Sequence, residues 1–189
     1  MQLGFYFDQT RCVGCLTCAV ACKDWHDLPA GKVNWMGVTC VEEGRFPNLF
    51  VAYLIRTCYH CEEPPCVSAC PTQAITKREE DGIVVVDKEA CLGDSACGGM
   101  CGEVCPYKAP QFHDDAGAKM EKCDLCLERW QQGKMPICVE ACPMRALDAG
   151  SLEELRSKYG DCREGAGFVH ISEAGPSILI KGKQNPYEV

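Results

Sequence analysis

Sixteen of the 18 cysteines fall into four groups of four, and their spacing is that of metal ligands. The groups are Cys12, Cys15, Cys18 and Cys22; Cys58, Cys61, Cys66 and Cys70; Cys91, Cys97, Cys101 and Cys105; and Cys123, Cys126, Cys138 and Cys142. Every group ends C-x3-C, and three of the four continue with proline, namely Pro71, Pro106 and Pro143. This repetition indicates a metal-binding unit used several times. Runs of the type C-x2-C-x2-C-x3-C are typical of [4Fe–4S] clusters.

The first group shows why cubane clusters suit this spacing. C-x2-C-x2-C places three thiolates on one tight loop, and the fourth cysteine of such a run ligates a different cluster. A cysteine three residues further on lies on the next helical turn and points away from its own loop, and a proline after it redirects the chain. Four groups therefore predict two exchanging pairs and four clusters.

Zinc and disulfides are the competing interpretations of these cysteines. Structural zinc favours two C-x2-C pairs a dozen or more residues apart, so the first group crowds one ion, whereas the fourth group alone fits a zinc site. A disulfide framework requires an oxidising compartment. Cys40 and Cys162 match no group, and we expect them to be free buried thiols.

The third group departs most from the pattern, because its first gap has five residues and its loops contain Gly93, Gly98, Gly99 and Gly102. We expect a normal cubane there. The alternatives are loss of one iron and competition from Asp94 as a ligand.

Short elements must position these cysteines, and they predict an α+β fold. Strands are expected over 3–7 and 49–56, hairpins over 74–77 with 83–87 and over 110–113 with 118–121, and short helices near the third cysteine of each group. Ser151 and Glu154 form a capping box for a helix that Gly160 ends. Residues 27–48 are interpreted as an inserted loop region, and 161–189 as an extended arm whose most strand-like part is 178–180.

Charge and hydropathy limit the partners. The formal net charge of −8 disfavours nucleic acid and anionic lipid and suits a basic protein surface, although it also serves solubility. Residues 1–8 lack a basic, apolar leader, and no run reaches the ~20 apolar residues of a membrane span. We expect no direct membrane insertion and a cytoplasmic location by default, with periplasmic co-export alongside a partner as the alternative.

The sequence shows no nucleophile–base pair, phosphate loop or dinucleotide motif, so no substrate-converting site is expected. The predicted activity is one-electron transfer, tuned by charge and hydrogen bonds near the ligands. Candidates for tuning the cluster potentials are His60 and six cations, Lys23, Lys77, Arg78, Lys108, Lys122 and Arg145. The alternative for each cation is a solvated surface charge. Trp25 and Trp130 are expected to be core or docking residues rather than electron relays.

At this point the chain resembles the four-cluster iron–sulfur subunits of the complex iron–sulfur molybdoenzymes, the dimethyl sulfoxide reductase family. The closest stretches are CVGCLTCAVACKD (12–24), KRE (77–79) before DGIVVVD (81–87), CPYKAPQ (105–111) and PICVEACPMRALD (136–148). The resemblance spans about residues 4–160, and only the combination of motifs is specific.

The resemblance implies that the first group pairs with the fourth and the second with the third. The implied ligand sets are Cys12, Cys15, Cys18 and Cys142 for cluster 1; Cys58, Cys61, Cys66 and Cys105 for cluster 2; Cys91, Cys97, Cys101 and Cys70 for cluster 3; and Cys123, Cys126, Cys138 and Cys22 for cluster 4. Two bacterial-ferredoxin-like units follow, one from 1–26 with 118–150 and one from 49–117, before a C-terminal helix and arm at 151–189.

The resemblance also implies a hetero-oligomer of the kind used in anaerobic respiration. A large catalytic subunit with a molybdenum or tungsten bis-pterin centre would be joined by the clusters to a quinone-linked membrane subunit or another redox partner. A free-standing soluble polyferredoxin is the alternative, and a zinc-binding interaction module is a remote one.

Overall fold

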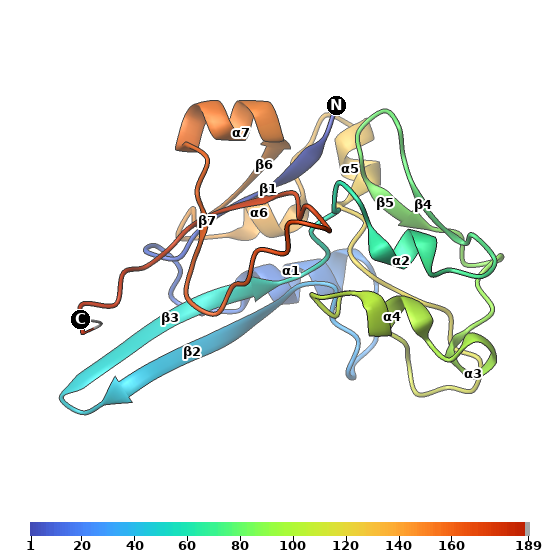
Figure 1. Cartoon of the computed structure of the whole chain (residues 1–189), viewed down its shortest axis with the longest axis horizontal. Helices are drawn as coiled ribbons and strands as arrows, with labels where there is room; N and C mark the ends of the chain where they lie inside the picture. Colours follow the sequence, from blue (N-terminus) through green and yellow to red (C-terminus); the bar gives the residue numbers. More distant parts are fainter. Residues whose placement is uncertain (188–189) are drawn as a thin grey trace.

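A four-stranded sheet with the order β6-β1-β8-β7 forms the centre of the computed structural model, which describes residues 1–187 (Figure 1). Strand β1 (Leu3–Asp8) is buried along its whole length. It pairs antiparallel with β6 (Leu147–Ser151) and parallel with β8 (Ile178–Lys181), which in turn pairs parallel with the short β7 (Arg163–Glu164). The strand predicted over 3–7 is confirmed.

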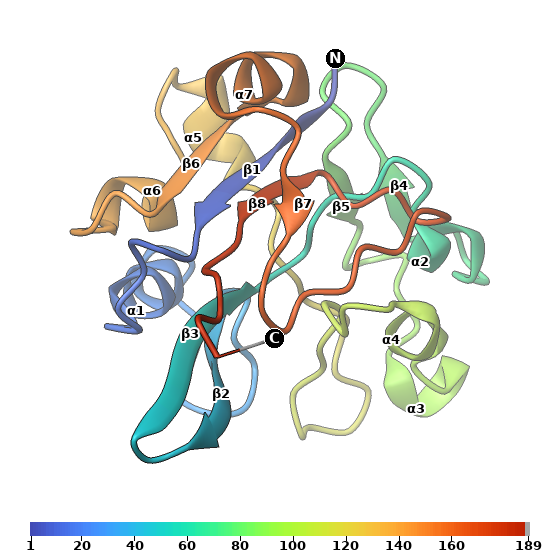
Figure 2. The ribbon, with the colours of Figure 1, turned by 60° about the vertical axis from the view of Figure 1, so that its left-hand side comes forward.

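Helices α1 (Thr17–Trp25) and α6 (Ile137–Ala141) pack against each other beside this sheet, and α5 (Leu127–Gln131) lies within the fourth cysteine group, between Cys126 and Cys138. Helix α7 (Leu152–Tyr159) covers one end of the sheet (Figure 2). Its capping box is formed as predicted, since Ser151 Oγ accepts from Glu154 N–H.

The second and third cysteine groups lie in a separate set of short elements, on the right in Figure 1. These are α2 (Pro65–Ser68), α3 (Asp94–Cys97), α4 (Met100–Val104) and the hairpin of β4 (Ile75–Lys77) with β5 (Val84–Val86). Helix α2 packs against α4 just as α1 packs against α6. Helices α2, α4 and α6 all end before a Cys-Pro pair, because proline cannot continue a helix. The architecture is the predicted α+β, ferredoxin-like type.

The longest element is a hairpin that projects from the molecule (Figure 1). It pairs β2 (Gly37–Arg45) with β3 (Asn48–Arg56) over nine residues of each strand. Strand β3 confirms the strand expected over 49–56, but the interpretation of 27–48 as a loop region is wrong for residues 37–45, which form β2. Most of β2 is exposed, so it lacks the alternating apolar pattern that would reveal it, and pairing with β3 stabilises it instead.

Two further expectations need correction. The strand-like part expected over 178–180 is confirmed as β8. Residues 161–187 are nevertheless no extended arm, because β8 lies between β1 and β7 and its Ile180 is completely buried. The hairpin expected over 110–121 is reduced to one bridge between Gln111 and Glu121. Its second half serves the third cysteine group instead, since Met120 N–H donates to Cys91 Sγ. Among residues 1–187 no helix has both the length and the apolar character that a bilayer crossing requires.

Candidate metal centres

Three small cavities are each lined by four cysteines, which come from two different groups. The first has a volume of about 20 Å³, the second about 10 Å³ and the third about 20 Å³. In that order, their cysteines are Cys12, Cys15, Cys18 and Cys142; Cys58, Cys61, Cys66 and Cys105; and Cys70, Cys91, Cys97 and Cys101. In every cavity the fourth cysteine comes from the end of another group, which is the exchange that the C-x3-C spacing predicts.

The remaining four cysteines form the most deeply buried set. Burial, followed by the neighbouring Cys22, raises the pKa of the Cys123 thiol, and burial with Cys126 and Cys22 raises that of Cys138. Burial and then Cys126 raise the pKa of Cys22 to about 12. These four thiols therefore lie close to one another in the interior.

The chain alone is a poor environment for so many thiolates. Burial raises the pKa of Cys61 and of Cys66 to about 12, and that of Cys18 to about 11. Thiolate ligands are stabilised when a metal cation shares their charge. Four converging thiols with raised pKa values thus fit a metal cluster far better than an empty cavity.

Backbone N–H groups are directed at several of these sulfurs. Ala109 N–H donates to Cys105 Sγ (3.5 Å) and Ala146 N–H to Cys142 Sγ (3.4 Å). Both bonds arise in the repeated Cys-Pro-x-x-Ala turn, which follows the end of a helix. Hydrogen bonds to ligand sulfur are a main determinant of cluster potential, so the turn both holds the ligand and tunes it.

One glycine in the first loop is required by its surroundings. Gly14 has φ +68°, and a Cβ there would lie 2.3 Å from the Tyr53 ring. The loop Cys12–Cys15 can therefore wrap its cavity only with glycine at this position.

The family description "4Fe-4S dicluster domain" matches residues 49–152. The chain is 43% identical over 192 residues to the B chain of anaerobic dimethyl sulfoxide reductase from Escherichia coli K12, and the match covers 97% of this chain and 90% of that protein. It is 41% identical to the protein of the same name from Haemophilus influenzae, with 95% and 89% covered, and 33% identical to Protein NrfC of Escherichia coli K12, with 84% and 69% covered.

The chain belongs to the 4Fe–4S dicluster family. It is an iron–sulfur electron-transfer protein that carries four [4Fe–4S] clusters. The donor set fits this cofactor, because thiolates are the ligands of [4Fe–4S] clusters and the structure gathers sixteen of them as four sets of four.

Threonine hydroxyls contact two of the less buried ligand candidates, Cys15 and Cys70. The sequence analysis did not predict these contacts. The Thr17 hydroxyl lies 3.4 Å from Cys15 Sγ, and its bond lowers the pKa of that exposed thiol. Burial opposes ionisation of Cys70, but bonds from Thr72 outweigh it and lower the pKa. A Cys-x-Thr pattern is the signal that could have found both.

Of the histidines His60 and His26, it is His26 that contacts a ligand sulfur. His60 is a candidate for tuning, with ordinary packing as the alternative. Its Nδ1 accepts from Val84 N–H (3.0 Å) and its Nε2 has no partner within residues 1–187. Burial first, and then the charge of Lys122, lower its pKa. His26 was overlooked, yet its Nε2 lies 3.4 Å from Cys126 Sγ. The three ligand atoms of His26, Asp124 and Cys126 all lie within 4.8 Å of one another, so this contact belongs to the deepest set.

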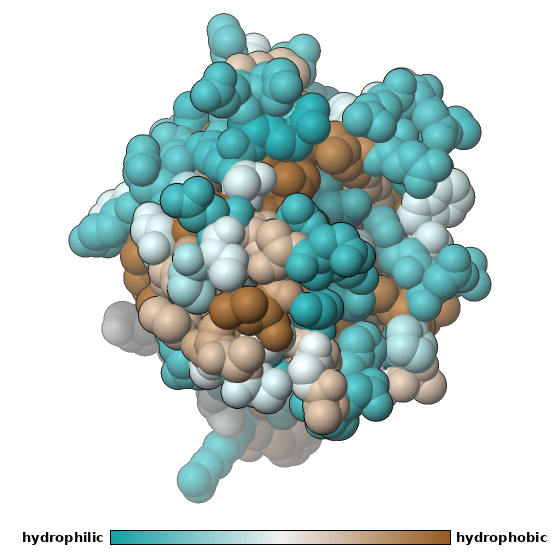
Figure 3. All heavy atoms as spheres, turned by 90° about the vertical axis from the view of Figure 1, so that its right-hand side faces the viewer, coloured by the Kyte–Doolittle hydropathy of each residue, from teal (hydrophilic) through white to brown (hydrophobic). Residues whose placement is uncertain are grey.

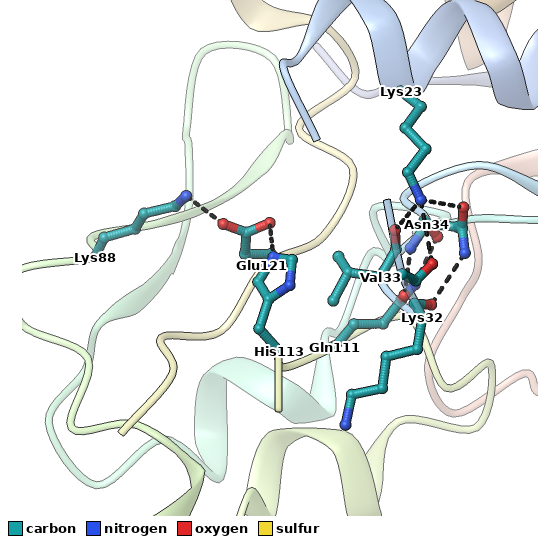
Figure 4. Close-up of polar contacts among 9 residues, drawn as sticks. Lys23, Lys32, Val33, Asn34, Lys88, Gln111, His113 and Glu121 are labelled. Atoms are coloured by element: carbon teal, nitrogen blue, oxygen red, sulfur yellow. Dashed lines mark hydrogen bonds and ion pairs between the residues drawn. The ribbon is translucent and has the colours of Figure 1, made fainter. Parts of the chain in front are cut away.

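Of the six candidate cations, Lys122 alone is buried. Lys23 is held by the 31–34 loop, where it donates to the carbonyls of Gly31 and Val33 and to Asn34 Oδ1 (Figure 4). That loop is bound in turn to Gln111, whose side chain exchanges two hydrogen bonds of 2.7 Å with the Asn34 backbone. Lys23 thus ties α1 to the segment that leads to the fourth cysteine group.

Lys77 and Lys108 donate to backbone carbonyl oxygens and Arg78 donates to the Asp81 carboxylate, all at or near the surface, and Arg145 is exposed. The Lys108 side chain is 63% exposed, which fits the alternative of a solvated charge. Whether Lys77, Arg78 or Arg145 tunes a cluster stays a prediction.

The remaining candidates take peripheral places. Trp25 is 40% exposed under the guanidinium of Arg129, whose Cζ lies 4.5 Å from the ring centroid, while Trp130 is partly buried. Asp94 Oδ1 accepts from Ser95 N–H and does not line the third cavity.

The two ungrouped cysteines differ from each other. Cys40 is exposed on β2, so the expectation that it is buried is wrong, and Cys162 is half-buried.

Proposed function

We propose that this chain is the electron-transfer subunit of a molybdenum or tungsten bis-pterin oxidoreductase, and that it links the catalytic subunit to a quinone-linked membrane subunit or another redox partner. The observation that carries the proposal is the gathering of sixteen cysteines into four sets of four. Relatives that match nearly the whole sequence are each named as one lettered component of a reductase, which supports a role beside other subunits.

The proposed ligands are the three sets that line the cavities and the deepest set. Cluster 1 takes Cys12, Cys15, Cys18 and Cys142; cluster 2 takes Cys58, Cys61, Cys66 and Cys105; cluster 3 takes Cys91, Cys97, Cys101 and Cys70; and cluster 4 takes Cys123, Cys126, Cys138 and Cys22. Residues 1–26 with 118–150 then form one ferredoxin-like unit, and residues 49–117 form the other. The packing of α1 on α6 and of α2 on α4 supports this division.

When bound, each cluster supplies a one-electron couple. The protein's part is to hold the ligands at different depths. Cys123 and Cys138 are buried, whereas Cys15 is exposed and Cys97 is half-buried. The first and third sets thus lie nearest the surface, which is where a redox partner can approach.

Apolar side chains surround these two outer sets. Val13, Leu16 and Met144 line the first cavity and are 52%, 49% and 42% exposed. Leu92 and Met100 line the third cavity and are 48% and 46% exposed. Figure 3 shows the end of the molecule that carries α3 and α4, where hydrophobic atoms reach the surface among hydrophilic ones. We call these two groups of exposed apolar side chains, one around each outer set, collars. We propose that partner subunits cover both collars and exclude water from the outer sets.

Anaerobic purification of the tagged chain from its own cells tests the proposal. We expect a large subunit with molybdenum or tungsten to co-purify. Leu16→Asp and Leu92→Asp should each retain iron but lose one partner, because a carboxylate in a collar cannot be desolvated cheaply. Val169→Asp is the matched control, since Val169 is 67% exposed and outside both collars. A chain that keeps its clusters but purifies alone would instead be a polyferredoxin.

A further inference from the structure

Lys122 is a buried ammonium group without a carboxylate partner. Its residue is 3% exposed, and its Nζ donates to the carbonyl oxygens of Val84 and Cys123, the second at 3.0 Å. No ion pair within residues 1–187 includes Lys122. A lysine is rarely buried unless an opposite charge compensates it. Two carbonyl dipoles satisfy hydrogen bonds but leave its charge uncompensated.

The ammonium group lies where two cysteine sets meet. Lys122 lines the cavity of Cys58, Cys61, Cys66 and Cys105, and its charge acts on the Cys66 thiol. The next residue, Cys123, belongs to the deepest set. The Lys122 side chain therefore contacts the set of Cys58, Cys61, Cys66 and Cys105, and the Cys123 side chain belongs to the deepest set.

Thr57 and Cys58 show the same relation with the two sets exchanged. Cys58 belongs to the set that Lys122 lines, and the residue before it is Thr57. The Thr57 hydroxyl is buried, has no oxygen or nitrogen partner, and lies beside the Cys123 sulfur. In both segments, the residue that precedes a ligand faces the other set, so the two units are joined at this crossing.

Val84 holds this junction in place. Its carbonyl accepts from Lys122, while its N–H donates to His60 Nδ1 at 3.0 Å. Because Nδ1 is an acceptor, the His60 proton lies on Nε2 and the ring is neutral. Of the two side chains that bond to the Val84 backbone, Lys122 therefore carries the positive charge and His60 does not.

We propose that Lys122 places a positive charge between clusters 2 and 4 and thereby favours the reduced state of both. This inference rests on the ligand sets of the proposed function. A reduced cluster carries one more negative charge, and a cation is more effective inside the protein than in water because the local dielectric is low. The uncompensated charge of Lys122 is then balanced by the clusters, and electron exchange between the two units takes place beside it.

The test compares three variants of the anaerobic holo-protein by potentiometric titration followed by electron paramagnetic resonance. Lys122→Gln removes the charge but keeps an N–H₂ group that can donate to the Val84 and Cys123 carbonyls. Lys122→Arg keeps the charge. Lys108→Gln is the matched control, because Lys108 lies three residues after Cys105 but its side chain is 63% exposed.

We expect Lys122→Gln to lower the ratio of reduced to oxidised cluster at a fixed potential about tenfold, or about 59 mV for a one-electron couple. Two of the four centres should shift and two should not. Lys122→Arg and Lys108→Gln should leave all four close to wild type. Four unchanged centres in an iron-replete Lys122→Gln protein would overturn the inference, and so would an equal shift in Lys108→Gln.

If Lys122→Gln loses iron, Lys122→Arg decides the question. Iron retention in the arginine variant supports a requirement for charge, and iron loss in both variants overturns the proposal. A wild-type protein without iron would instead refute the proposed function itself, so the two failures can be told apart.

Discussion

Replacement of Ile180 by alanine tests whether the C-terminal segment is part of the core on which the cluster sites depend. Ile180 is 0% exposed in β8, opposite Phe7 of β1 and Arg163 of β7. Its Cγ2 is so close to Gly165 that a Cβ there would lie 2.7 Å away. Strands on both sides prevent the cavity from collapsing, so we expect a loss of about 3–5 kcal/mol, in the upper part of the range for such truncations.

The assay follows the loss of visible cluster absorbance after anaerobic transfer into a fixed urea concentration. A rate is preferable to an equilibrium constant, because unfolding with loss of a bound cofactor is not two-state. If half of the lost free energy lowers the unfolding barrier, bleaching accelerates roughly ten- to seventy-fold.

Val169→Ala is the control, because Val169 lies in the same segment but is 67% exposed. It should bleach within about twofold of wild type, as surface substitutions usually do. Equal rates for the two variants at equal iron content would refute the structural role of β8.

Three further perturbations test local features. Ser151→Ala removes the cap of α7 and should cost about 1 kcal/mol, which a modest acceleration of the same bleaching reports. Thr17→Val removes a hydroxyl contact to Cys15 Sγ and should lower the potential of one centre in a redox titration, whereas Thr17→Ser should restore it. Asp148→Asn tests pH dependence. Burial opposes ionisation of Asp148, but hydrogen bonds lower its pKa below the ordinary value, so its stabilisation is complete at neutral pH. The rate difference from wild type in pH-jump unfolding should stay constant near neutrality and shrink as the pH falls below about 4; a difference that grows on acidification contradicts it.

The sequence predicts those parts of the protein that depend on local spacing. Cys-Pro pairs end α2, α4 and α6, and Ser151 with Glu154 begins α7, because each of these signals acts within a few residues. The grouping of cysteines likewise follows from their spacing, although the exchange partners of each group needed a family resemblance.

Long-range contacts explain most of what could not be predicted. Strand β8 pairs in parallel with β1 from the far end of the chain, and no local pattern identifies such a partner. His26 reaches Cys126 Sγ across 100 residues of sequence. Lys122 resembles any other lysine in the sequence, and its burial becomes visible only when Val84 and Cys123 are placed around it.

Metal analysis of the anaerobically purified protein tests the central claim most directly. Iron and acid-labile sulfide should each reach about sixteen per chain, four in each of four clusters, with zinc nearly absent, and reduction should produce the paramagnetic signal of [4Fe–4S] centres. Iron removal by a chelator should also unfold most of the chain, because thiolate–metal bonds supply much of its folding energy. A pale protein with stoichiometric zinc, or with far fewer than about twelve iron atoms per chain, would contradict this account.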